Sequence, residues 1–74
     1  MPNFKDFERY YSTVPQNIKI RLVKLHMNRS TLSQITGIPY STLTLCMNEP
    51  KRFRLGDLAL ISDALGVGIE TLFN

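Results

Sequence analysis

The feature that most constrains how this chain folds is a short break between two segments of helical periodicity, at Gly37. The segment before the break has apolar residues at helical spacing, and Asn28 or Ser30 can cap its N-terminus, which predicts a helix over residues 29–36. Glycine is favoured where a helix stops with a positive φ. Pro39 then opens another helical segment, so about three residues must turn the chain between two helices.

Apolar periodicity predicts helices along the rest of the chain as well. Their expected ranges are 3–11, 15–27, 40–47, 55–65 and a final short helix within 69–73. Pro15 suits the first turn of a helix, because its missing N–H is unpaired there, so we expect Ser12 and Thr13 to end the first helix. The alternating apolar and charged residues at 18–22 would also suit an edge strand. We favour an all-α fold with five or six short helices.

A chain of 74 residues forms one small domain, so the apolar stripes of these helices must meet in a single core. The stripe positions expected to be buried are Ile18, Leu22, Leu32, Ile35, Leu43, Leu58, Ile61, Leu65 and Leu72.

A second apolar patch is expected on the far side of the 15–27 helix, where Ile20 and Val23 lie. The aromatic N-terminal segment could cover this patch or bind a partner, and we favour the first. This interpretation divides the chain into a helical extension at residues 1–16, packed on a domain of residues 17–74.

Positive charge is concentrated in the middle of the chain. Residues 17–54 carry seven Lys and Arg residues with Glu49 as the only acid, whereas residues 55–74 carry three acids and no Lys or Arg. Residues 1–16 are neutral, and the whole chain has a net charge of +3. A basic cluster of this kind is typical of surfaces that bind nucleic acid, although ordinary solvated surfaces also show it.

Several classes of protein are excluded by what the sequence lacks. A single cysteine, Cys46, and a single histidine, His26, can form neither an internal disulfide nor a zinc site of four ligands. We interpret Cys46 as a core residue and His26 as a solvated or helix-end residue. With no catalytic signature, we expect no enzyme activity, cofactor or metal. No apolar run approaches the roughly 20 residues of a membrane span, so we expect a cytoplasmic protein without membrane contact.

Two stretches give the chain a family resemblance. Residues 32–43 read LSQITGIPYSTL, in which a Leu and a small residue precede a Gly turn, an aliphatic residue and a Ser-Thr-aliphatic run. The second stretch combines LALISDALGV at residues 58–67 with IETLF at 69–73. In this order and spacing they resemble the Cro and C-repressor type of helix-turn-helix, the lambda-repressor-like family, over residues 17–74. The resemblance implies a compact helix-turn-helix domain that binds double-stranded DNA.

The resemblance also implies roles for individual residues. Gly37 would form the turn, the small side chain of Ser33 would let two helices approach, and Leu43 and Cys46 would be core residues of the recognition helix. The residues facing DNA bases or a partner would be Tyr40, Ser41, Thr42, Thr44, Leu45 and Asn48. The residues near phosphates would be Arg29, Lys51, Arg52 and Arg54.

The recognition helix departs from the usual readers of DNA sequence. Arg, Lys, Asn and Gln present paired hydrogen-bonding groups to purines, and this helix has none before Asn48. Leu45 stands where a polar reader is usual. An exposed leucine can contact a thymine methyl group or bind another protein.

These observations leave two hypotheses. The first is a small transcriptional regulator that binds DNA and can act as a homodimer on a near-palindromic operator, as the basic residues favour. The second is a modulator or antirepressor of a phage-type genetic switch, which binds a larger repressor protein through the same surface, as Leu45 and Met47 favour.

Overall fold

The computed structural model describes the backbone of residues 4–74 and the side chains of residues 11–74. The elements in these residues are α1 (Phe4–Lys24), α2 (Arg29–Thr36), α3 (Tyr40–Asn48), the 3₁₀ helix η1 (Pro50–Arg52), α4 (Leu55–Leu65) and the 3₁₀ helix η2 (Ile69–Phe73). The all-α fold class is therefore confirmed, and residues 18–22 belong to a helix rather than a strand. No described helix has both the length and the apolar character that crossing a membrane requires.

The expected break before Pro15 is wrong, because α1 continues through this proline. Pro15 removes one backbone N–H from the helix and disfavours the helical conformation locally. Its side chain and those of Val14 and Ile18 are nevertheless buried in the core. Tertiary packing thus stabilises a helix that the local sequence would end, and the two predicted N-terminal helices become one.

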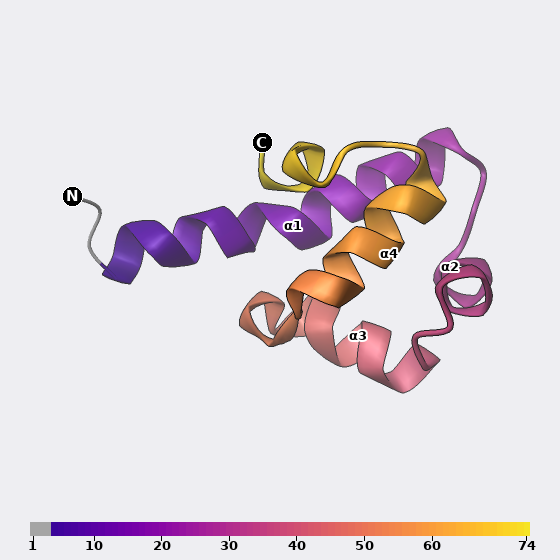
Figure 1. Cartoon of the computed structure of the whole chain (residues 1–74), viewed down its shortest axis with the longest axis horizontal. Helices are drawn as coiled ribbons and strands as arrows, with labels where there is room; N and C mark the ends of the chain where they lie inside the picture. The colour runs from indigo at the N-terminus through magenta and orange to yellow at the C-terminus, as the bar shows by residue number, and fades with distance from the viewer. Residues whose placement is uncertain (1–3) are drawn as a thin grey trace.

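This continuity also overturns the expected docking on the patch of Ile20 and Val23. The side chain of Ile20 is 47% exposed and that of Val23 is 74% exposed. A helix that runs on without a break cannot fold back over its own later turns, and Figure 1 shows the N-terminal half of α1 extending away from the other helices. Phe4 and Phe7 themselves lie outside the residues whose side chains are described.

Three of the described helices end at a left-handed residue, and in α1 and α4 the next backbone N–H also donates back to the last turn of the helix. In α1 this residue is His26, with φ 52°, and the Met27 N–H donates to the Leu22 carbonyl at 2.9 Å. In α4 it is Gly66, with φ 70°, as the sequence predicts. Glycine adopts this conformation without the steric cost that a side chain carries, so His26 ends α1 at a cost that Gly66 avoids.

The core lies where α1, α3, α4 and η2 meet. Its buried apolar residues are Val14, Ile18, Leu22, Leu32, Ile38, Leu43, Cys46, Met47, Phe53, Leu58, Ile61, Leu65 and Leu72. Every predicted core residue is among them except Ile35, which is 55% exposed. Leu32 is the buried residue of α2, with half-buried Ser33 and Thr36 beside it, and Ile35 points about 110° away from the centre of these three at 100° per residue.

Polar side chains of α1 hold the C-terminal segment against it. The Asn17 amide donates to the carbonyls of Leu72 at 2.8 Å and Asn74 at 2.9 Å. Arg21 donates to the Leu65 carbonyl at 3.2 Å, so it satisfies an acceptor in the last turn of α4. Figure 1 shows the C-terminal segment lying along α1. The second half of α1 therefore holds the C-terminal segment in place.

Candidate nucleic-acid interface

The start of α2 is fixed by Asn28. Its side-chain oxygen accepts hydrogen bonds from the Thr31 backbone N–H at 2.8 Å and the Thr31 hydroxyl at 3.0 Å. Asn28 has an extended backbone, as an N-cap residue does. Asn28 is thus the cap, one of the two residues that the sequence offered, and Arg29 is the first helical residue.

The turn between α2 and α3 is held by both backbone and side chains. Gly37 has φ 77°, and its N–H donates to the Ser33 carbonyl at 2.9 Å, which confirms its predicted place at the turn. The Ser33 hydroxyl donates to the Ile38 carbonyl at 2.6 Å, and the Ile38 N–H donates to the Thr36 hydroxyl at 3.2 Å. Ser33 therefore does more than leave space, because it hydrogen-bonds across the turn and fixes where α3 begins.

The outward face of α3 carries most of the residues that the sequence assigned to it. Its exposed side chains are Tyr40, Ser41, Thr42, Leu45 and Asn48. Leu45 is 45% exposed, whereas Leu43 is fully buried and anchors the helix in the core. The exposed face thus offers a phenol, small hydroxyls and an aliphatic side chain before its single amide.

Two residues of α3 do not belong to this face. Thr44 is half-buried, and its hydroxyl oxygen is enclosed without a hydrogen-bond partner, so it does not point toward bases as expected. Met47 is buried at 5% exposure, so it contributes to the core rather than to a surface for a protein partner. Both lie on the inner side of α3, which packs against α2, η1 and α1.

Cys46 lies in the core, as the sequence predicts, with 4% of its surface exposed. Burial raises the pKa of its thiol above the ordinary value of 9.0. The Asp57 carboxylate raises the pKa further, while the positive charges of Arg52 and Arg54 lower it. The thiol is therefore protonated at neutral pH, which is the state of an inert core cysteine.

The segment after α3 is a tight turn with a buried anchor. The Arg52 N–H donates to the Glu49 carbonyl at 2.9 Å, and the Phe53 N–H donates to the Pro50 carbonyl at 3.1 Å. Phe53 is buried, whereas Lys51 and Arg52 are exposed. A buried aromatic residue within a basic run, Phe53, thus fixes the backbone that carries the cations, and no local sequence signal indicates this role.

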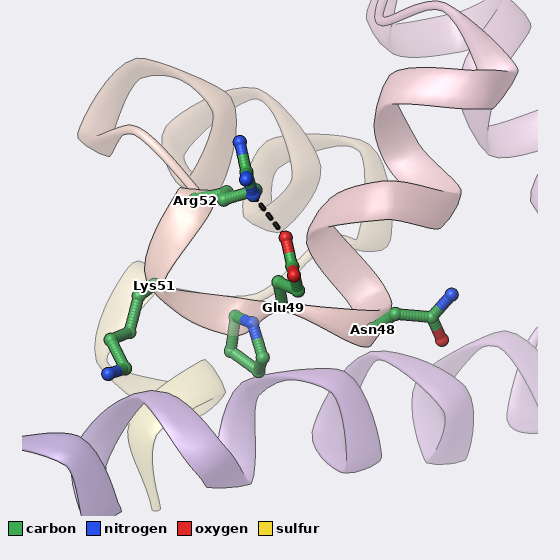
Figure 2. A pocket seen from close by; sticks show the side chains of 5 residues that line it. Asn48, Glu49, Lys51 and Arg52 are labelled. Carbon is green, nitrogen blue, oxygen red and sulfur yellow. Dashed lines mark hydrogen bonds and ion pairs between the residues drawn. The ribbon is translucent and has the colours of Figure 1, made fainter.

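The cations of this turn differ in their surroundings. Arg52 forms an ion pair with Glu49. Figure 2 shows these two side chains pointing toward each other, while Lys51 and Asn48 point away from the pair on opposite sides. Because Glu49 offsets part of the charge of Arg52, this residue presents less positive charge than the sequence count indicates.

Arg54 and Asp57 define the start of α4. The Asp57 carboxylate accepts a hydrogen bond from the Arg54 backbone N–H at 3.4 Å, and an acidic residue in the first turn interacts favourably with the helix dipole. This arrangement places the negative charge of Asp57 at the N-terminus of α4. The exposed Arg54 side chain lies just before it.

The structure brings part of the predicted site together in a shallow groove. The groove is lined by Thr42, Leu45, Cys46, Arg52, Arg54 and Asp57. Side chains from α3 therefore meet two of the predicted phosphate-binding residues, although the two groups are separate in the sequence. Arg29 is half-buried at the start of α2 and does not line this groove, and neither does Lys51.

A family model described as the Cro/C1-type HTH DNA-binding domain matches residues 17–74. The match covers the last eight residues of α1 and every later element. No curated protein and no solved structure shows significant similarity to the chain.

Proposed function

Because the chain belongs to the Cro/C1-type helix-turn-helix DNA-binding family, we propose that it regulates transcription by placing the outward face of α3 in the major groove of double-stranded DNA. In this proposal Arg52 and Arg54 contact phosphates beside the groove, Lys51 contacts the backbone further along, and Arg29 does so at the start of α2. The observation that carries the proposal is the groove in which Thr42 and Leu45 meet two arginines.

The charge distribution supports this orientation. The acidic residues of segment 55–74 include Asp63 and Glu70, and none of the exposed residues on the outward face of α3 is acidic. Phosphate contacts by Lys and Arg supply affinity that does not depend on sequence and that falls as salt increases. We therefore expect much of the binding free energy to come from the DNA backbone.

A salt titration of duplex binding tests the proposal. Fluorescence anisotropy with a labelled duplex should show measurable binding at low salt. Each phosphate contact removed should lower the slope of log affinity against log salt by about one, so Arg54→Ala should bind every duplex more weakly with a shallower slope. Lys24→Ala removes an equal charge from exposed α1 and serves as the matched control, with an unchanged slope. Absence of duplex binding by the unmodified protein at low salt would contradict the proposal.

The number of protein copies on DNA can be measured in the same system. A homodimer on a near-palindromic operator places its two recognition helices about one turn of DNA apart, roughly 34 Å. Footprinting therefore separates a dimer, which protects two half-sites, from a monomer, which protects one.

The exposed Leu45 favours a second candidate function, which is binding to a larger repressor protein as a modulator or antirepressor of a phage-type genetic switch. Aliphatic side chains fill pockets at protein interfaces, and Leu45 is 45% exposed on a face with few polar readers. The variant Leu45→Glu separates the two functions. At a DNA surface the added charge weakens binding in a way that salt relieves, whereas at an apolar interface it abolishes a stoichiometric complex with little relief.

A further inference from the structure

Leu45 is the only leucine on the exposed face of α3, and its surroundings indicate what it contacts. Resting on the DNA-binding function proposed above, we propose that Leu45 determines sequence specificity by packing against the C5 methyl group of thymine. The operator then contains thymine at one or two fixed positions of each half-site.

The groove combines apolar groups with cations at its side. Leu45 and Thr42 are three residues apart on α3, so they lie on one face and both present methyl groups. Arg52 and Arg54 line the same groove. In the major groove of DNA a thymine methyl projects from the base edge, close to the phosphates of its own strand. A ligand with a small apolar group beside negative charge fits this arrangement.

Asp57 is the one acid in the groove, and its position limits repulsion of phosphate. Its carboxylate accepts a hydrogen bond from the Arg54 backbone N–H at 3.4 Å, and it lies in the first turn of α4. Part of its negative charge is therefore balanced by the helix N-terminus. Arg54 is the main positive charge of the groove, because Glu49 offsets part of the charge of Arg52.

The other exposed side chains of α3 leave thymine contact as the strongest source of discrimination. Ser41 and Thr42 have hydroxyl groups that form single hydrogen bonds, which distinguish bases weakly. The hydroxyl of Thr44 is enclosed. Asn48 stands at the last position of the helix. Contact between a thymine methyl group and Leu45 therefore supplies a large share of the sequence discrimination. No residue of α3 before Asn48 can form the paired hydrogen bonds to a base that would outweigh it.

The same contact predicts a preference for DNA over RNA. Uracil lacks the C5 methyl group, and the major groove of A-form RNA is too deep and narrow for side chains to read. Both differences act against binding of double-stranded RNA by this surface.

Deoxyuridine substitution tests the proposal, because it removes only the methyl group of thymine. Binding sites are first selected from a pool of random duplexes with the unmodified protein. Each thymine of a selected site is then replaced by deoxyuridine, and affinity is measured at constant salt. Burial of one methyl group changes affinity by about fourfold, so one or two positions should show a loss of this size.

The variant Leu45→Ala completes a double-mutant cycle with the methyl group. It should bind thymine and deoxyuridine sites equally, because the partner of the methyl group is gone. Leu60→Ala is the matched control, since Leu60 is a comparably exposed leucine on α4, at 49%, and it should keep the fourfold difference.

Three results overturn the proposal and are distinguishable. If the protein binds its selected sites but no thymine is sensitive to deoxyuridine, the inference fails and the DNA-binding function stands. If sensitivity persists in Leu45→Ala and disappears in Thr42→Ser, Thr42 is the reader instead of Leu45. If no duplex is bound at low salt, the proposed function fails as well.

Discussion

The hydroxyl of Ser33 gives a quantitative test of how the turn before α3 is held. It donates to the Ile38 carbonyl at 2.6 Å, close to the buried side chain of Ile38. Ser33→Ala keeps the residue small but removes this donor, which costs about 1.5 kcal/mol. Alanine's higher helix propensity offsets roughly 0.5 kcal/mol of that loss. We therefore expect the free energy of unfolding to fall by about 1 kcal/mol and the melting temperature to fall by about 4–8 °C.

Thermal unfolding followed by far-UV circular dichroism measures this effect. Ser30→Ala, at an exposed position on the same helix, is the control and should change the free energy of unfolding by less than about 0.5 kcal/mol. Urea unfolding should show an unchanged m-value for both variants, because neither alters the surface buried on folding. Equal melting temperatures for Ser33→Ala and Ser30→Ala would refute the hydrogen-bond argument and leave Ser33 only its role as a small residue.

Two further predictions concern His26 and Cys46. His26→Gly should raise the free energy of unfolding by about 0.5–1 kcal/mol, because it relieves the left-handed conformation at the end of α1, whereas His26→Ala should give no such gain in the same denaturation assay. The folded Cys46 thiol has a pKa above the ordinary 9.0 of the unfolded chain, so its contribution to stability is complete below about pH 9 and is lost as the pH rises through the folded pKa. Between about pH 8 and about pH 10, the unmodified protein should lose more stability in urea than Cys46→Ala does; an equal loss would contradict the burial argument.

Local signals in the sequence predicted the helix-turn-helix closely. The helix at 29–36 has the predicted bounds, and Gly37 has the positive φ that the turn requires. Capping and left-handed termination depend on residues within one turn of the helix end, so the sequence carries them directly. The same holds for Gly66.

Features that depend on tertiary packing were predicted less well. Pro15 is a local helix breaker, yet the buried side chains around it keep α1 continuous. Ile35 has helical spacing from Leu32, but spacing alone does not give the centre of the buried arc, and α2 turns Leu32 inward and leaves Ile35 exposed. A short helix offers too few residues to fix its orientation from periodicity.

In the candidate site, too, features set by local sequence were predicted better than features set by tertiary packing. The sequence identified the exposed face of α3 and the basic turn, but it placed the buried Met47 on the surface and the enclosed hydroxyl of Thr44 toward bases. The groove that joins Leu45 to Arg54 depends on how η1 turns the chain, and that turn depends on the burial of Phe53. No short stretch of the sequence predicts the burial of Phe53.

The hydrogen bond from Asn17 to Leu72 spans 55 residues and has a consequence for the order of folding during synthesis. Leu72 is the last core residue along the chain, so α1 leaves the ribosome long before its partner in η2 is made. Helices α2 and α3 are translated in between, before residues 69–73 can pack on α1. A nascent chain halted before that point holds an incomplete core with Val14 and Ile18 lacking Leu72, which makes it a target for chaperones and proteases.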